Sequence, residues 1–354
     1  GHVDNGRFSE IKSPDNRFRL SGCTPAFRYN SLWCQEGSRL HEFSEGGIKT
    51  HDISEFVTAG TRAILFDKED NIWLATQSDG LVRLTRRTIA LLGDMTDLNV
   101  WGRYAIAQDG NGTVWVAGHD LLKVQNSEVK SIPIPNNVAG AQLIKALAVD
   151  RNDVLWAGGL TNLYVVRNDV SYPVPNFEVG PINALFFDRQ NNLWVGSEKG
   201  LWRYVDGQID HITTTDGLVG NNVRFITQTK DDTLWIGAIG GVSKFKDGKF
   251  ENLTPENGLS GNYVREILED DDGTIWIGTY GGGINRLRDG KLQAITTSQG
   301  LQDNFISRIL VDDENKFWIL GNLGIFAVDR AELNAVADHE KSSLIGSRYG
   351  VADG

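Results

Sequence analysis

Residues 271–292 read DDGTIWIGTYGGGINRLRDGKL, and most of this stretch recurs elsewhere in the chain. Residues 231–250 read DDTLWIGAIGGVSKFKDGKF, and residues 190–209 read QNNLWVGSEKGLWRYVDGQI. Each copy places short runs rich in β-branched and aromatic residues between Asp, Asn and Gly turns, without helical periodicity. The stretch therefore predicts a repeated unit of antiparallel β-strands.

A Trp marks the second expected strand of each unit. Eight of these follow one another at intervals of 40, 42, 41, 38, 41, 41 and 42 residues: Trp33, Trp73, Trp115, Trp156, Trp194, Trp235, Trp276 and Trp318. A period near 40 with one Trp per unit is typical of a propeller, whose four-stranded blades bury large side chains between them. We therefore predict an all-β propeller of four-stranded antiparallel blades, a single domain over residues 1–354. Eight blades are favoured and seven are the alternative, because the unit around Trp33 is the most degenerate.

An Asp recurs six residues before the motif Trp, and this spacing indicates a structural role. The series is broken by Thr229 and otherwise comprises Asp67, Asp109, Asp150, Asp188, Asp270 and Asp312. An Asp at this place caps a turn with its carboxylate. The glycines of YGGGIN (280–285) serve a tight turn, since no helix and no Lys-Ser/Thr pair follows them as a phosphate loop requires.

Charge and composition argue against several functions. The chain has 354 residues and a formal net charge of −11, whereas a nucleic-acid partner requires a broad Lys/Arg footprint. No apolar run approaches the ~20 residues of a membrane-spanning helix. Neither Cys23 nor Cys34 has a Cys or His at metal-ligand spacing. We therefore expect no nucleic-acid partner, no metal, no cofactor and no catalytic residue.

Basic residues recur where the innermost strands should begin, eleven residues before each motif Trp and near the mouth of the central funnel. From the second unit to the eighth these positions are Arg62, Tyr104, Lys145, Asn183, Arg224, Arg265 and Ser307. Like charges in a ring cost folding energy unless they are neutralised, and Arg suits carboxylates and phosphates. We predict that Arg62, Lys145, Arg224 and Arg265 bind an anionic ligand. Pairing with Asp and Glu of adjacent loops is the alternative.

Aromatic side chains are expected on the same face as these cations. With Tyr104, the candidates are Trp101, Tyr263, Tyr280 and Phe305, beside His119 and the amides of Asn221, Asn222, Asn262 and Asn304. Aromatic planes combined with amides and Arg suit a sugar or a small organic acid. The alternative is that Trp101 and Phe305 only plug the funnel.

The repeat resembles the two-component regulator propeller repeat. DDGTIWIGTYGGGI (271–284) and RQNNLWVGSEKGL (189–201) carry the resemblance, together with connectors such as TTDGLVGNNV (214–223) and PENGLSGNYV (255–264). In that family the propeller is the extracytoplasmic sensor of a membrane-bound histidine kinase or diguanylate cyclase, followed by an immunoglobulin-like connector, a membrane helix and a signalling domain. The resemblance thus implies a periplasmic or extracellular sensor that binds a small ligand, an acidic saccharide or an organic acid, and has no enzymatic activity.

Two other functions remain open. One is a lyase similar to the streptogramin or polysaccharide lyases, and the other is a protein-interaction ring. A lyase needs a general base near its substrate with an electrophilic partner or a metal. The sequence offers no His pair, metal-ligand cluster or Ser-His-Asp arrangement at the expected funnel.

The two ends of the chain suggest part of a longer receptor. Asn5–Ile11 looks like a fourth strand without its first three, and Tyr349–Gly354 looks like the start of a connector. We expect Asn5–Ile11 to pair beside the third strand of the last unit and so to close the ring. An insertion near Asp329–Lys341 predicts one short helix.

Cys23 and Cys34 flank an expected hairpin, in which they would sit opposite each other at a separation compatible with a disulfide; two buried free thiols are the alternative. Mass spectrometry of the unreduced protein is expected to show them bridged if the domain is exported. The bridge closes a short loop and therefore contributes at most ~2–3 kcal/mol. Two free thiols in oxidised protein would remove the support that these residues lend to an exported location.

Overall fold

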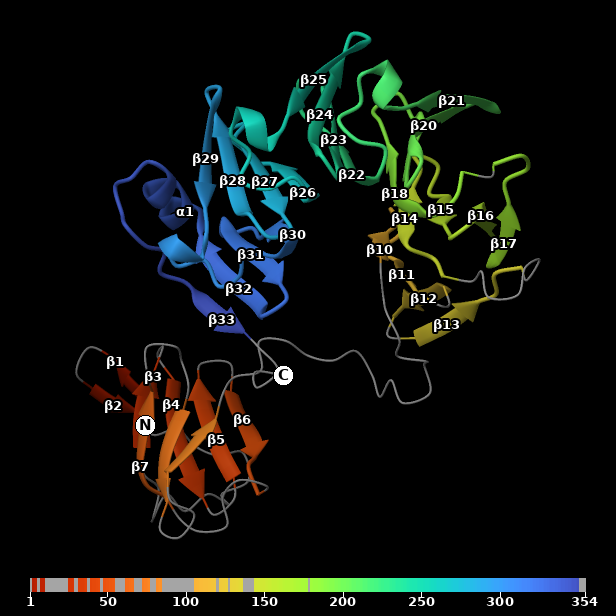
Figure 1. Cartoon of the computed structure of the whole chain (residues 1–354). Helices are drawn as coiled ribbons and strands as arrows, with labels where there is room; N and C mark the ends of the chain where they lie inside the picture. Colours follow the sequence, from red (N-terminus) through yellow and green to blue (C-terminus); the bar gives the residue numbers. More distant parts are fainter. Residues whose placement is uncertain are drawn as a thin grey trace. The chain divides into compact units, whose positions relative to one another are not determined.

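The computed structural model describes residues 2–4, 7–9, 25–28, 31–36, 39–44, 47–54, 61–66, 72–76, 81–84, 105–118, 121–126, 128–135, 143–177 and 179–349. The chain divides into two compact units, one comprising Gly1–Ala90 with Asp353–Gly354 and the other Leu91–Ala352 (Figure 1). The predicted single domain over residues 1–354 stays a prediction.

The first unit contains a two-stranded, a four-stranded and a three-stranded sheet among its described residues. Their strands are β1 (His2–Asp4) and β2 (Arg7–Ser9); β3 (Pro25–Arg28), β4 (Ser31–Glu36), β5 (Arg39–Ser44) and β6 (Gly47–Asp52); and β7 (Thr61–Phe66), β8 (Ile72–Thr76) and β9 (Leu81–Leu84). Strands β3 and β7 contact each other. Leu40, Ile53 and Leu74 form a small buried cluster in this unit.

The second unit is a propeller of six blades, each a four-stranded antiparallel sheet in chain order. The blades are β10 (Ala105–Gln108), β11 (Val114–Ala117), β12 (Leu121–Gln125) and β13 (Glu128–Ile132); β14 (Ala146–Val149), β15 (Leu155–Gly158), β16 (Leu163–Arg167) and β17 (Val170–Pro173); β18 (Ile182–Phe187), β19 (Leu193–Ser197), β20 (Gly200–Val205) and β21 (Gln208–Ile212); β22 (Val223–Gln228), β23 (Leu234–Ala238), β24 (Gly241–Lys246) and β25 (Lys249–Leu253); β26 (Val264–Glu269), β27 (Ile275–Thr279), β28 (Gly283–Arg288) and β29 (Lys291–Ile295); and β30 (Ile306–Val311), β31 (Lys316–Gly321), β32 (Gly324–Asp329) and β33 (Ser347–Tyr349).

The prediction of eight blades, with seven as the alternative, is wrong, because the propeller has six blades of four strands. The strands of the Trp33 and Trp73 units fall in the first compact unit. The Trp period counts repeated units in the sequence correctly. Which units join one propeller depends on packing between blades, and the period carries no information on that packing.

Packing between consecutive blades holds the second unit together. The first strands contact their successors from β10 to β30, and five buried apolar clusters each combine residues of two consecutive blades. The Trp on the second strand lies in these clusters in the first five blades, as predicted, whereas Trp318 of the last blade stacks on Tyr349. The Gly two residues later allows the next blade to approach: a Cβ on Gly196 would lie 2.5 Å from a methyl carbon of Val223, and one on Gly237 would lie 2.8 Å from Val264. The Trp-x-Gly motif is therefore a packing motif.

The Asp six residues before the Trp connects its turn to that packing. In five blades one carboxylate oxygen accepts the backbone N–H four residues later, and the other accepts the indole N–H at 2.8–3.3 Å; the residues are Asp109, Asp150, Asp188, Asp270 and Asp312. Where Thr229 replaces the Asp, its hydroxyl accepts the indole N–H of Trp235 at 3.1 Å and donates to Asp231 at 2.6 Å. The carboxylate of this turn thus belongs to Asp231, two residues after the usual position, and the hydrogen bond to the indole is retained through Thr229.

The last blade confirms one prediction and corrects another. The predicted helix is present as α1 (Arg330–Ala337), between β32 and β33. In contrast, β32 pairs with β33, while Arg7–Ser9 of the segment expected to close the ring pairs with β1. Strands β1 and β2 form a hairpin with a short loop. Closing this loop costs less entropy than pairing the two ends of the chain. In the described part of the chain, no helix is both long and apolar enough for a membrane span.

Asp188→Ala is expected to lower the free energy of unfolding by about 2–3 kcal/mol, because the backbone N–H of Asn192 and the indole N–H of Trp194 both lose a charged acceptor. Denaturant unfolding followed by Trp fluorescence measures this change. Asp313→Ala, in the exposed turn between β30 and β31, serves as the control. Equal stability of both variants would show that the carboxylate does not anchor the blade.

Candidate functional site

A β-bulge lies near the start of the inner strand in four blades of the propeller. The pairing register skips one residue between Ile182 and Ala184, between Val223 and Phe225, and at the same place in the next two blades. The skipped residues are Asn183, Arg224, Arg265 and Ser307, and Arg62 is skipped likewise in β7 of the first unit. A bulge re-aims the side chain that it frees from the ladder, and bulges are frequent beside functional sites. All five lie at the inner-strand position that the sequence placed near the funnel mouth, and Arg62, Arg224 and Arg265 among them were predicted to bind a ligand.

Two of the predicted cations converge on one neutral atom. The Lys145 ammonium donates to Oδ1 of Asn183 at 2.7 Å, and the Arg224 guanidinium donates to the same oxygen at 3.1 Å. The Asn183 amide nitrogen donates to the Val223 carbonyl at 3.2 Å, which fixes its orientation. An amide oxygen thus holds two positive charges together without neutralising either.

Little negative charge compensates this cluster. Arg224 lies 3.9 Å from the carboxylate of Glu198, whereas neither Lys145 nor Arg265 pairs with a carboxylate of the described residues. Burial lowers the pKa of Lys145, the nearby Arg224 and Arg265 lower it further, and Glu198 opposes them. Nε of Arg224 is also buried without a partner in the described chain. The cluster retains net positive charge and an unused donor.

Aromatic rings continue the cluster across the next two blades. The Tyr263 ring has the Arg224 guanidinium 5.6 Å from its centroid and that of Arg265 at 5.5 Å, and Arg265 also donates to the Tyr263 hydroxyl at 3.1 Å. Tyr280 lies 5.9 Å from Arg265 and meets Phe305 edge to face at 4.7 Å. Tyr280 and Phe305 are 39% and 40% exposed. Cation–π contact keeps the guanidinium groups beside an accessible aromatic surface.

A buried acid lies on the inner strand next to Arg265. Glu266 is 4% exposed and accepts a hydrogen bond at 3.1 Å from Arg308, which lies on the inner strand of the next blade. Burial raises the pKa of Glu266 to about 8, although Arg308 and Arg265 partly oppose the shift. Its carboxyl group therefore titrates near neutral pH and joins two blades beside the candidate site.

Six of the ten predicted site residues come together in the structure, and the side chains of the other four are not described. Lys145, Arg224, Arg265, Tyr263, Tyr280 and Phe305 form one continuous group through the contacts above. Trp101, Tyr104 and His119 lie outside the described residues, as does the side chain of Arg62. Asn221 and Asn304 serve the connectors instead, since their side-chain oxygens accept N–H groups of Thr214 and Thr297.

Sequence reasoning missed three participants. Asn183 was visible at the inner-strand position, yet its role as the shared acceptor depends on two other blades. Glu198 directly follows β19, the second strand of its blade, and Glu266 directly follows the bulge residue Arg265. Their contacts arise between blades, so a pattern within one unit carries no signal for them.

Comparison with known proteins agrees with the repeat assignment. The family model described as two component regulator propeller matches residues 176–199 and 258–281. These matches overlap the stretches on which the resemblance rests, so the predicted resemblance is confirmed. No curated relative matches the chain.

Solved structures of similar fold come from proteins of different function. The extracellular domain of the hybrid two-component system BT3049 from B. thetaiotaomicron is 19% identical with a TM-score of 0.63, and the match covers 96% of this chain and 48% of that one. The present chain thus spans about half the length of that domain. Virginiamycin B lyase from Staphylococcus aureus is 14% identical, with a TM-score of 0.51 and coverage of 88% and 96%. PorZ of the Porphyromonas gingivalis type-IX secretion system is 12% identical, with a TM-score of 0.51 and coverage of 86% and 58%. At these identities the likeness concerns the fold alone.

Glu266→Gln is expected to flatten the dependence of the melting temperature on pH. The unfolded carboxyl titrates near its ordinary pKa of 4.5 and the folded one near 8, so its contribution to stability is complete below pH 4.5 and is lost as the pH rises towards 8. The amide carries no such titration. Thermal melts from pH 4.5 to 8.5 measure the effect, and parallel curves for the two proteins would contradict the raised pKa.

Proposed function

From the premise that the chain carries two-component regulator propeller repeats, we propose that it is a ligand-binding sensor domain of a membrane-bound signalling receptor. The domain works outside the cytoplasm, and its ligand is a small anion held by Lys145, Arg224 and Arg265. It has no catalytic activity of its own. Its output domain is a histidine kinase or a diguanylate cyclase carried by the same receptor.

The observation that carries this proposal is the convergence of Lys145 and Arg224 on a single amide oxygen. The two positive charges repel each other, and among the described residues the one carboxylate that pairs with either is Glu198, 3.9 Å from Arg224. An anion that displaces or joins the Asn183 oxygen relieves that repulsion. Guanidinium groups suit such a ligand because their N–H donors match carboxylate and phosphate oxygens.

The aromatic side of the site favours a ligand with an extended body. Tyr280 and Phe305 present ring surface next to Arg265, which separates them from the Lys145 end. A ligand with a charged group at one end and a ring or carbon skeleton at the other meets both parts. An acidic saccharide and a carboxylic acid with an apolar body are the two chemical classes that fit this description.

Contacts between blades offer a way for binding to influence the whole domain. Lys145, Asn183 and Arg224 come from three consecutive blades, and Tyr263 extends the contact to a fourth. A ligand that draws these groups together changes the spacing of the inner strands. The ligand shifts the receptor from one state to the other only if it binds one of the two states more tightly.

Arg224→Ala and Arg265→Ala are each expected to weaken ligand binding by ~1–3 kcal/mol, the usual value of a charged hydrogen-bonding partner. Thermal melts with a panel of uronic acids, sugar phosphates and aromatic carboxylates identify a ligand through a raised melting temperature. Titration calorimetry then measures its affinity at rising salt, and screening is expected to weaken it.

Arg189→Ala is the matched control, because Arg189 pairs with Asp232 and lies in the exposed turn after β18, at the opposite end of that inner strand from Asn183. It should bind the ligand as the unmutated chain does. If no anion of the panel raises the melting temperature of any form, or if the two site variants bind as tightly as the control, the proposed anion site is wrong.

A further inference from the structure

One inner-strand position of the fifth blade carries an acid where the two preceding blades carry apolar residues. The strand ladder resumes there, one residue after the bulge. Ala184 and Phe225 occupy this position in the third and fourth blades, and both belong to or pack against buried apolar clusters. In the fifth blade the residue is Glu266, which pairs with Gly278 and is 4% exposed. Burial of a carboxyl group at such a boundary is costly unless it is paired or protonated.

Two cations approach the Glu266 carboxyl. Arg308 of β30, in the next blade, donates to it at 3.1 Å, and the Arg308 side chain is 49% exposed. Arg265 precedes Glu266 on β26 and adds a second positive charge. Among the other strands in contact with β26, β22 carries Arg224, whereas β23 and β27 carry no charged residue. Glu269, at the far end of β26, accepts a backbone N–H of the preceding blade. In the described part of the chain, the close partner of the buried carboxyl is thus a half-exposed guanidinium.

The protonation state of Glu266 sets the net charge beside the candidate site. Burial outweighs the two cations and raises the pKa of Glu266 to about 8, so the carboxyl is mostly protonated at neutral pH and ionises as the pH rises through 8. The protonated carboxyl leaves the charges of Arg265 and Arg308 uncompensated. The ionised one places a negative charge next to both, where the low dielectric of the interior makes its effect large.

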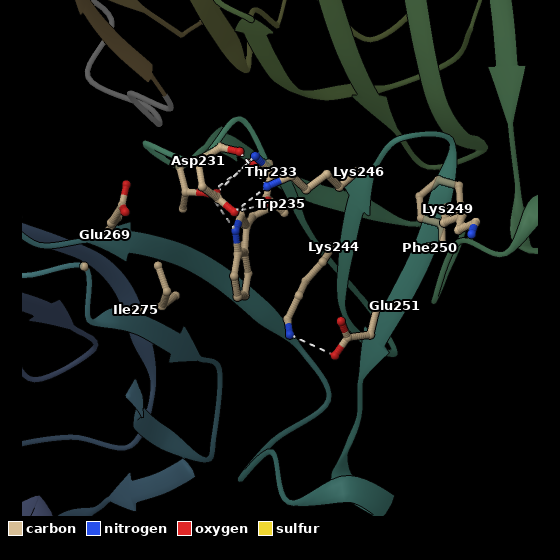
Figure 2. A pocket seen from close by; sticks show the side chains of 12 residues that line it. Asp231, Thr233, Trp235, Lys244, Lys246, Lys249, Phe250, Glu251, Glu269 and Ile275 are labelled. Atoms are coloured by element: carbon tan, nitrogen blue, oxygen red, sulfur yellow. Dashed lines mark hydrogen bonds and ion pairs between the residues drawn. The ribbon is translucent and has the colours of Figure 1, made fainter. Parts of the chain in front are cut away.

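Positive charge at the outer strands of the fourth and fifth blades is balanced instead. Lys244 pairs with Glu251 at 3.0 Å and Lys246 with Asp231 at 2.8 Å, around a cavity of about 770 Å³ (Figure 2). The lining of this cavity has as many carboxylates as lysines. The excess of positive charge in these two blades therefore belongs to their inner strands, where Glu266 lies.

We propose that Glu266 regulates the candidate site, which binds its anion tightly while the Glu266 carboxyl is protonated and releases it when that carboxyl ionises. This inference rests on the proposed function, because it concerns the same anion held by Lys145, Arg224 and Arg265. The ionised carboxylate competes with the ligand for the positive charge of Arg265. Since linkage is reciprocal, a bound anion stabilises the protonated carboxyl, and binding takes up protons.

Lys145 also loses charge as the pH rises, and its effect on binding has the same sign. Burial lowers the pKa of Lys145, and Arg224 and Arg265 act in the same direction. Loss of the ammonium charge removes one attraction for the anion. The two residues are therefore told apart by variants at each position.

Benzenesulfonate is the probe, because its charge stays fixed over the pH range and its ring suits the exposed surfaces of Tyr280 and Phe305. Titration calorimetry measures its affinity for the full chain from pH 6.5 to pH 9 at constant ionic strength. The dissociation constant is expected to rise by about fivefold or more, as is typical of coupling between two sites. At pH 8, titrations in two buffers of different ionisation enthalpy are expected to show net uptake of protons on binding.

Variants assign this pH dependence to one residue. Glu266→Gln keeps an acceptor for Arg308 and removes the titration, so its affinity should change less than about twofold over the range, without proton uptake. Glu266→Ala, with the residue that the third blade has in Ala184, should do the same. Lys145→Gln is expected to bind more weakly throughout and to keep the pH dependence. Glu198→Gln is the matched control: it removes the other carboxylate near the cations, 3.9 Å from Arg224, and should keep the pH dependence as well.

The outcomes separate this inference from the proposed function. If benzenesulfonate binds to no form at any pH, the anion site is wrong and its regulation falls with it. If binding occurs but is independent of pH, or if the dependence persists in Glu266→Gln and disappears in Lys145→Gln, the regulation by Glu266 is wrong and the anion site stands. Thermal melts at both ends of the pH range verify that each variant is folded, and the proton uptake is measured on the unmutated chain.

Discussion

The contact of each motif Trp with the next blade is the interaction on which the propeller depends. The Trp lies between two sheets, the Gly two residues later admits the facing inner strand, and the preceding Asp links the indole to the turn that starts the strand. One short motif thereby couples a turn, a strand and a neighbouring blade. Since each blade is stabilised largely by its neighbours, the stability of such a repeat array is distributed over these boundaries.

This regular packing allows the inner strands to present different side chains at one repeated position. The bulge recurs at Asn183, Arg224, Arg265 and Ser307, and the packing around it remains the same whichever residue is there. The bulge frees that side chain from the ladder, so its identity is set by what the centre of the propeller needs. The clustered positive charges oppose folding because they repel one another. We infer that they serve the binding of an anionic ligand.

Departures from the repeat occur where blades differ in their surroundings. Thr229 and Asp231 share between them the role of one Asp, which preserves the indole hydrogen bond. Helix α1 covers Trp276, whereas Leu287 packs against the cluster that buries Trp235. A repeated scaffold can therefore vary its outer grooves independently of its inner strands, because the two surfaces use different strands of the same blade.

The sequence by itself determined the repeat, the strands, the structural role of Trp and Asp, the short helix and the positions of Lys145, Arg224 and Arg265, because these follow from periodicity, turn chemistry and local pattern. It did not determine the number of blades in the propeller or the pairing of β32 with β33. Nor did it indicate the shared acceptor Asn183 or the buried Glu266. Only the tertiary structure decided these, since each depends on contacts between strands separated by many residues, most of them in different blades.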